Sequence, residues 1–406
     1  MTQSFDVIIA GGGMVGATLA CALSGHGMRI ALVEPVRNEQ RAEPGYDDRA
    51  IALAWGTSRI FAGLGLWDAL SAHATPIHRI HVSDRGHAGM VHMDRESEGL
   101  PAIGYVVPAH AIGQVLADAV SRLDDVTQFC PATVTGLSAG EQHAQVMIRQ
   151  DDGELQVQAA LVVAADGAGS RLREQAGIRS QRRDYRQTAI VTNITPQLPH
   201  NHSAWERFTD TGPLALLPMS QGRCGVVWTV ASDQAERVMA LSDDEFLAQL
   251  QERFGNRLGQ LQRVGVRQAW PLQLLSATQS VAPRLALIGN AIHTLHPIAG
   301  QGFNLGARDV AALAEVLVDA LRGGQDPGAA PVLARYADWR ARDHHNVTIF
   351  TDGLARLFTL SLPGLGILRS AGMLAFDLFP PAKRMLTRLT MGRSGRTPRL
   401  ARGLPL

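Results

Sequence analysis

The feature that most constrains the fold is a glycine-rich turn close to the start of the chain. An apolar, β-branched run at residues 5–10 leads directly into the sequence G-x-G-x-x-G. In such a unit, Gly11 takes a tight turn, Gly13 lets a phosphate approach the backbone, and Gly16 lets the following helix pack closely on the strand. We expect that helix over about residues 14–24, with its free N–H groups aimed at the phosphate.

A second apolar run, at residues 29–33, ends at Glu34. An acid at this place accepts the ribose hydroxyls of an adenosine. Glycine spacing alone matches by chance, but strand, turn, helix, second strand and terminal acid together predict a dinucleotide site. The alternative is a glycine-rich turn in an ordinary α/β sheet. NAD and FAD share the adenosine diphosphate half, so this unit does not distinguish them.

A later segment repeats the form of a buried strand followed by a polar turn. The apolar run at residues 161–165 ends in Asp166 and Gly167, and a short helix with Ser170 near its cap follows. Continuous apolar runs of this length are typical of strands buried on both faces of a parallel sheet. We therefore expect a second contribution to the nucleotide-binding domain here.

A third segment begins with the apolar run at residues 284–288 and turns at Gly289 and Asn290. A loop that contains Pro and Gly follows at residues 297–302. After it, apolar residues recur at helical spacing, which predicts a helix over about residues 302–321. The positive N-terminal end of this helix points at the loop, where it favours negative charge.

Together the three segments resemble the fingerprints of single-component, FAD-dependent aromatic hydroxylases, over about residues 5–345. The resemblance implies an α/β fold with a Rossmann-like FAD-binding domain, an inserted antiparallel β-sheet substrate domain and a C-terminal helical segment. The expected boundaries are residues 1–75, 100–180 and 281–345 for the discontinuous FAD-binding domain, 76–99 and 181–280 for the substrate domain, and 346–406 for the C-terminal helical segment with its basic tail.

The resemblance also implies roles for individual residues. The residues expected to bind FAD are Gly11, Gly13, Gly16, Glu34, Arg49, Asp166, Gly289, Asn290, Gly302 and Asn304. The residues expected to form the catalytic environment of the flavin ring are Pro297, Gly300, Gln301 and Gly302. The alternative for Arg49 is that it is an ordinary surface arginine with no contact to the cofactor. Asn290 stands where most of the family has Asp, and its amide still offers a donor and an acceptor to a ribityl hydroxyl.

The run at residues 296–306 is similar to the branch of this family that acts in ubiquinone biosynthesis. Further stretches, at residues 46–53, 81–89, 206–209 and 212–220, narrow the resemblance. It then implies a 2-polyprenyl-6-methoxyphenol as substrate, hydroxylated on its ring by O₂ through a flavin C4a-hydroperoxide. No second G-x-G-x-x-G follows a strand, so no separate nicotinamide domain is evident, and the resemblance implies NAD(P)H as a transient co-substrate. Two alternatives are a flavin-binding scaffold subunit of a quinone-biosynthesis assembly, and a flavin reductase or dehydrogenase on the same fold.

The sequence assigns no base for the phenol. Glu206 is either a residue of the substrate pocket or the partner of Arg207 or Arg223 in a cross-strand pair. A carboxylate contributed by the inserted sheet is the side chain that such a base would need.

Four histidines are candidates for a metal site or for structural roles. His293 and His296 lie three residues apart, but no carboxylate or Cys follows at ligand spacing, so we expect them to order a turn or loop. His344 and His345 are expected on a solvated helix face. No metal is therefore predicted.

Charge and cysteine usage narrow the partners and the compartment. The 406 residues carry a formal net charge of +1, which gives no reason to expect nucleic acid. Three widely spaced cysteines do not make a disulfide framework, so we expect a reducing, cytoplasmic location. The uncharged run at residues 7–28 contains the glycine turn and is read as strand, turn and helix rather than as a membrane span.

The C-terminal end suggests a membrane surface. Residues 378–406 contain seven basic residues and no acid, after an apolar segment at residues 354–379 that Pro363 interrupts. Such a pair suits the anionic inner face of the cytoplasmic membrane, where polyprenyl substrates and other quinone-biosynthesis enzymes reside. The alternative is a helix packed on the body with a disordered basic end. Arg369 and Pro363 argue against a spanning helix.

Overall fold

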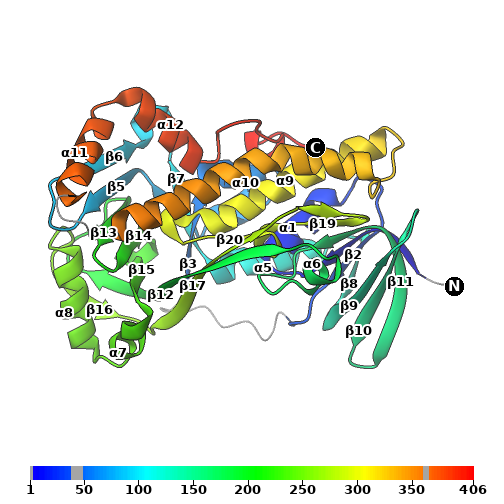
Figure 1. Cartoon of the computed structure of the whole chain (residues 1–406), viewed down its shortest axis with the longest axis horizontal. Helices are drawn as coiled ribbons and strands as arrows, with labels where there is room; N and C mark the ends of the chain where they lie inside the picture. Colours follow the sequence, from blue (N-terminus) through cyan, green and yellow to red (C-terminus); the bar gives the residue numbers. More distant parts are fainter. Residues whose placement is uncertain (1–2, 38–48, 360–364) are drawn as a thin grey trace.

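The structure is a computed structural model that describes residues 3–37, 49–359 and 365–406. It has two large sheets, joined by long strands and by a pair of long helices (Figure 1). Pro363 lies outside the described residues. The predicted combination of an α/β domain and an antiparallel sheet is confirmed.

In the described ranges the first sheet has eight strands with a parallel centre. The parallel strands, from one side to the other, are β19 (Leu285–Leu287), β11 (Gly153–Ala164), β1 (Ser4–Ala10), β2 (Ile30–Val33) and β8 (Val126–Phe129). The antiparallel additions are β9 (Ala132–Ala139), β10 (Ala144–Gln150) and β18 (Val281–Ala282). Val7, Ile8 and Ile9 are fully buried, because helices or strands cover both faces of the centre.

The second sheet is mainly antiparallel and has nine strands among the described residues. They are β5 (Arg79–Asp84), β6 (Met90–Asp94), β12 (Ser180–Pro196), β13 (Ser203–Thr209), β14 (Gly212–Pro218), β15 (Cys224–Ala231), β16 (Leu261–Val264), β17 (Gln268–Ala277) and β20 (His293–Thr294). Its outer side is covered by α7 (Ala235–Met239) and α8 (Asp243–Phe254). A small third sheet, β3 (Ala50–Ala54), β7 (Gly104–Pro108) and β4 (Thr75–Ile77), completes the strands.

The remaining helices surround the first sheet or connect it to the second. They are α1 (Met14–Leu23), α2 (Trp55–Gly63), α3 (Trp67–Ser71), α4 (Arg95–Glu98), α5 (Ala109–Val120), α6 (Arg171–Gln175), α9 (Gln301–Arg322), α10 (Ala330–Thr359), α11 (Leu365–Asp377) and α12 (Pro380–Thr390). α9 and α10 lie side by side, and α10 continues as far as β13 and β14 (Figure 1). The helices predicted after the glycine turn and after the Pro–Gly loop are therefore α1 and α9.

Close packing of glycines brings the predicted nucleotide segments together. A Cβ added at Gly306 of α9 would lie 3.2 Å from both the Cα of Gly289 and a methyl group of Val15 in α1. This approach fixes the turn that follows β19 between α1 and α9. The glycine turn and the Pro–Gly loop consequently lie on the same side of the first sheet.

The C-terminal tail packs on the body of the protein. Arg399 pairs with Asp319 of α9 at 2.5 Å, Leu400 is 1% exposed, and Arg396 stacks 3.7 Å from the ring centroid of Trp339. The alternative of a disordered basic end is therefore wrong, because acids and aromatic rings distant in sequence hold these arginines. Among the described residues, no helix combines the length and the apolar character that crossing a bilayer requires.

Candidate active site

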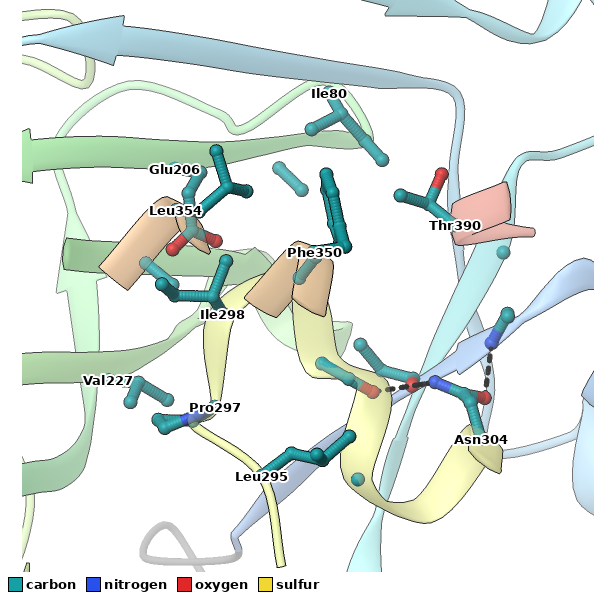
Figure 2. Close-up of a pocket in the computed structure, with 18 of the residues that line it drawn as sticks. Ile80, Glu206, Val227, Leu295, Pro297, Ile298, Asn304, Phe350, Leu354 and Thr390 are labelled. Atoms are coloured by element: carbon teal, nitrogen blue, oxygen red, sulfur yellow. Dashed lines mark hydrogen bonds between the residues drawn. The ribbon is translucent and has the colours of Figure 1, made fainter. Parts of the chain in front are cut away.

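A cavity of about 1130 Å³ extends from the glycine turn to the second sheet. Figure 2 shows the part of its lining around Pro297 and Glu206. Its lining includes Gly13 of the turn, Arg49 before β3, Asn290 after β19 and Gly300 before α9. Its far end lies between β13, β14 and the helices α10, α11 and α12. Segments from both ends of the chain thus share one cavity.

At two positions of the glycine turn the surrounding protein leaves no room for a side chain, and at a third it leaves open space. Gly11 has φ of 104°, and a Cβ there would overlap the carbonyl oxygen of Ala165. A Cβ at Gly16 would overlap the carbonyl oxygen of Gly11. A Cβ at Gly13 would meet nothing within 4 Å. The space beside Gly13, at the N-terminus of α1, fits a pyrophosphate.

Glu34 lies at the end of β2 beside the same turn. Its Oε2 accepts a hydrogen bond of 2.6 Å from the backbone N–H of Gly12, and its Oε1 accepts one of 3.1 Å from Val36. A small cavity of about 40 Å³, whose lining includes Gly13 and Glu34, adjoins this carboxylate. A carboxylate is an acceptor-only group of the kind that binds a ribose hydroxyl.

The Pro–Gly loop turns sharply before α9. Ala299 and Gly300 both adopt left-handed conformations, with φ of 56° and 59°. No described side chain caps the first turn of α9, so its N–H groups and the positive end of its dipole face the loop. Pro297, Gly300 and Gly302 line the cavity.

Gln301 lies behind this loop rather than in the cavity. It is 2% exposed, and its Nε2 donates to the carbonyl oxygens of Ala299 at 3.0 Å and of Thr390 at 3.2 Å. The side chain therefore ties the loop to α12. The sequence could not indicate this orientation, since the bonding partner lies 89 residues away.

Asn304 lines the cavity, but its side-chain amide is hydrogen-bonded to other groups of the protein (Figure 2). Its Oδ1 accepts from the N–H of Ala54 at 2.8 Å and the hydroxyl of Thr57 at 2.7 Å. Its Nδ2 donates to the carbonyl oxygens of Ala52 at 2.8 Å and Gly300 at 2.7 Å. These bonds hold β3 and α2 against the start of α9.

The other predicted cofactor residues surround the same region. Arg49 and Asn290 are exposed and line the cavity. Asp166 is exposed after β11, between the two lining residues Ala165 and Gly167. Gly289 has φ of 59°, and its N–H donates to a buried carboxylate behind the cavity.

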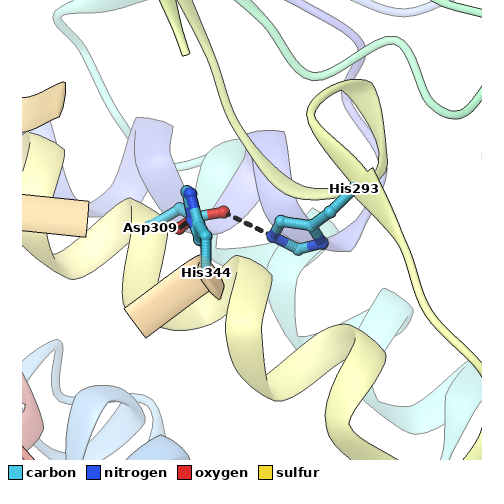
Figure 3. Close-up of side chains that lie close together, drawn as sticks. All are labelled: His293, Asp309 and His344. Carbon is cyan, nitrogen blue, oxygen red and sulfur yellow. Dashed lines mark hydrogen bonds and ion pairs between the residues drawn. The ribbon is translucent and has the colours of Figure 1, made fainter. Parts of the chain in front are cut away.

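That carboxylate, Asp309, is the centre of a buried polar cluster (Figure 3). It accepts hydrogen bonds from His293 at 3.0 Å, His344 at 2.6 Å and Arg340 at 2.8 Å, and from the N–H of Gly289 at 3.2 Å. Burial alone would raise the pKa of Asp309, but His344 and Arg340 hold it well below its usual range. The guanidinium already supplies the balancing cation, so the cluster braces α9, α10 and η4 (Gly289–Ala291).

Three of the four histidines lie as the sequence predicts, and His344 does not. His293 and His296 order their segment as predicted: His296 is buried and bonds Gln187 at 3.2 Å. His345 is exposed, as expected. The expectation of a solvated face is wrong for His344, because the helical turn of α10 points its ring at Asp309.

Glu206 of β13 lines the cavity (Figure 2). Its neighbour Arg207 points to the opposite face of the sheet, as successive residues of a strand do. The carboxylate accepts a hydrogen bond from the backbone N–H of Ala299. Burial raises the pKa of Glu206 to about 7, and that hydrogen bond opposes the rise.

Comparison with known proteins agrees with this geometry. The family model described as "FAD binding domain" matches residues 4–350. The chain is 40% identical to the ubiquinone hydroxylase UbiL of Rhodospirillum rubrum over 404 residues, 99% of this chain and 93% of the relative. It is 32% identical to the 3-demethoxyubiquinol 3-hydroxylase of Escherichia coli over 394 residues, 96% of this chain and 99% of the relative.

A solved structure has the same fold at low sequence identity. The p-nitrophenol 4-monooxygenase PnpA of Pseudomonas putida superposes with a TM-score of 0.80 and 20% identity, covering 97% of this chain and 100% of that one. FAD-dependent aromatic hydroxylases are the class of protein that combines a glycine turn, a Pro–Gly loop and an antiparallel sheet around one cavity. In this chain the antiparallel sheet is the second sheet. The chain belongs to the FAD-binding-domain family, and it is an FAD-dependent monooxygenase.

Proposed function

We propose that the protein hydroxylates the aromatic ring of a 2-polyprenyl-6-methoxyphenol in ubiquinone biosynthesis, with NAD(P)H and O₂ as co-substrates. The observation that carries the proposal is the single cavity that runs from the glycine turn to an apolar end between α10, α11 and α12. Relatives named ubiquinone hydroxylase support it. The stretches at residues 81–89 and 212–220 also resemble 2-octaprenyl-6-methoxyphenol hydroxylase.

The cofactor residues named from the sequence fit this role. Gly13 and the start of α1 would hold the pyrophosphate of FAD, Glu34 its adenosine ribose, and Arg49 and Asn290 its flavin half. When bound, FAD supplies the redox chemistry that links NAD(P)H, O₂ and the phenol. The uncapped N-terminus of α9 favours negative charge at the Pro–Gly loop.

The chain's own side chains keep water from the reacting groups. The lining near the Pro–Gly loop is apolar and includes Val227, Leu295, Ile298, Phe350 and Leu354 (Figure 2). Exclusion of water strengthens the electrostatic effect of the loop and suppresses loss of the activated oxygen as H₂O₂. The same surface accommodates an aromatic ring.

The far end of the cavity suits a long isoprenoid chain and a membrane. Leu368 of α11 and Met385 of α12 line the cavity and are also more than half exposed. Leu378 and Phe379, between these helices, are exposed as well, and Lys383 and Arg384 follow. We infer that this surface rests on an anionic bilayer, from which a prenyl chain enters. Contact with other quinone-biosynthesis enzymes stays a prediction.

Turnover distinguishes the candidate functions. The FAD-loaded protein is incubated with NADH or NADPH, O₂ and a phenol that carries a short prenyl chain. We expect NAD(P)H oxidation to rise with the phenol, and a hydroxylated product to accumulate. A scaffold subunit would show neither response. A reductase or dehydrogenase would transfer electrons without adding oxygen to the ring.

A further inference from the structure

The cavity contains one carboxylate among the described residues that line it. Its charged lining residues are Arg49, Glu206 and Arg369. Arg49 is exposed just before β3, and its guanidinium accepts no proton. Arg369 is engaged with Asp84 at 3.3 Å and with the carbonyl oxygens at the end of α10. Glu206 is therefore the lining residue equipped to accept a proton inside the apolar part.

The surroundings of Glu206 leave its carboxylate directed at the space beside the Pro–Gly loop. The elements packed around it present Val82 of β5, Ala215 of β14, Ile298 of η5 (Ile298–Gly300) and Leu354 of α10. The backbone N–H of Ala299 lies next to this carboxylate and favours its charged form. Two oxygens offer about four acceptor sites, so an incoming hydroxyl finds free capacity.

We propose that Glu206 is the catalytic base that accepts the proton of the phenol during hydroxylation. This assignment rests on the function proposed above. The phenol hydroxyl donates a hydrogen bond to a carboxylate oxygen of Glu206. As the ring carbon forms its new bond to one oxygen atom derived from O₂, the O–O bond breaks and the second oxygen atom leaves as water, with the two electrons that NAD(P)H supplied. In the same step the phenolic O–H bond breaks and its proton moves to Glu206. Removal of this proton increases the electron density of the ring when it attacks.

The proton returns within the same turnover. The attacked ring carbon loses its hydrogen as a proton, and Glu206 gives its own proton back to the ring carbonyl, which restores a hydroxyl. The overall reaction consumes the phenol, O₂, NAD(P)H and one proton, and it forms the diphenol, NAD(P)⁺ and water. Burial raises the pKa of Glu206 to about 7, so both of its protonation states are accessible near neutral pH.

The test compares the FAD-loaded wild type with Glu206→Gln, which keeps the shape and an acceptor but binds no proton. Glu252→Gln, at an exposed position of α8, is the matched control. We measure FAD content, phenol affinity, NAD(P)H oxidation and product formation over a range of pH. The expected result for Glu206→Gln is unchanged FAD content and phenol affinity, with product formation reduced by about 10²–10³-fold.

Two further readouts separate proton transfer from a merely structural role. Wild-type product formation should increase with pH through about 7, and the Glu206→Gln profile should lack this inflection. Ring-fluorinated phenols, which are more acidic, should recover part of the lost rate in the variant. The Glu252→Gln control should match the wild type in every measurement.

Three results would overturn the assignment or its basis. Equal product formation by Glu206→Gln and wild type would exclude a catalytic base at this position. Loss of FAD or of phenol affinity in the variant would assign Glu206 to support of Ala299 instead. A wild type that hydroxylates no phenol would contradict the proposed function itself. An active wild type with an equally active Glu206→Gln variant would contradict only the assignment of Glu206 as the base.

Discussion

Replacing Gly13 by Val tests whether the glycine turn holds the pyrophosphate of FAD. Gly13 has φ of −64° and ψ of −177°, a conformation open to any residue, and a Cβ there meets nothing within 4 Å. The substitution should therefore change the stability of the cofactor-free protein by no more than about 1 kcal/mol. A larger loss of FAD affinity would then come from a clash between the Val side chain and the cofactor, not from damage to the fold.

The loss of FAD affinity should be large. The side chain of Val enters the space where the pyrophosphate approaches the backbone, which displaces the phosphates from the N–H groups at the start of α1. Hydrogen bonds to charged groups contribute about 1.5–3 kcal/mol each. Loss of two of them costs about 3–6 kcal/mol, or about 10²–10⁴-fold in the dissociation constant.

The assay titrates FAD into cofactor-free protein and follows the quenching of flavin fluorescence, with thermal unfolding measured in parallel. Gly353→Ala, on an exposed turn of α10, is the control and should bind FAD normally. Gly16→Ala should instead damage the fold, because its Cβ would overlap the carbonyl oxygen of Gly11. Normal FAD affinity in a folded Gly13→Val protein would refute the phosphate assignment.

Three further variants test the remaining contacts. Asp309→Ala leaves Arg340 without its buried partner and should lower the free energy of unfolding by about 3–5 kcal/mol in urea titrations; a loss below about 1 kcal/mol would contradict the bracing role. Glu206→Gln should gain stability over wild type as pH rises, because the folded-state pKa of about 7 exceeds the ordinary 4.5 and ionisation therefore opposes folding. That gain should approach zero near pH 4 and reach up to about 3 kcal/mol at pH 8, and a pH-independent difference would exclude the raised pKa. Combined Leu378→Ser and Phe379→Ser should reduce sedimentation with anionic phospholipid vesicles at unchanged FAD content; undiminished binding would place the membrane contact elsewhere.

The parts of the site that the sequence predicts are those set by local chemistry. Gly11 and Gly16 leave no room for a side chain, and β1 and α1 follow from an apolar run and a glycine turn within one short segment. The start of α9 is similarly local, since a Pro–Gly loop precedes a helical apolar pattern. Patterns of this kind need no knowledge of the remaining chain.

Long-range partners account for what the sequence did not predict. The ring of His344 is hydrogen-bonded to Asp309, 35 residues earlier, and Asn304 bonds a strand about 250 residues away. Arg399 is held by acids of α9 about 80 residues earlier, and partners so distant in sequence cannot be recognised from the basic tail alone. The sequence does not decide between the two roles of Glu206, because strand alternation alone does not tell which face of a sheet borders a cavity.

The most direct test of the account is the mass of the product formed under isotopically labelled O₂. FAD-loaded protein, NAD(P)H and the prenylated phenol should give a diphenol that carries one labelled oxygen atom, and cofactor-depleted Gly13→Val should give none. An unlabelled diphenol, or consumption of NAD(P)H with H₂O₂ as the sole oxygen product, would contradict transfer of oxygen to a ring inside this cavity.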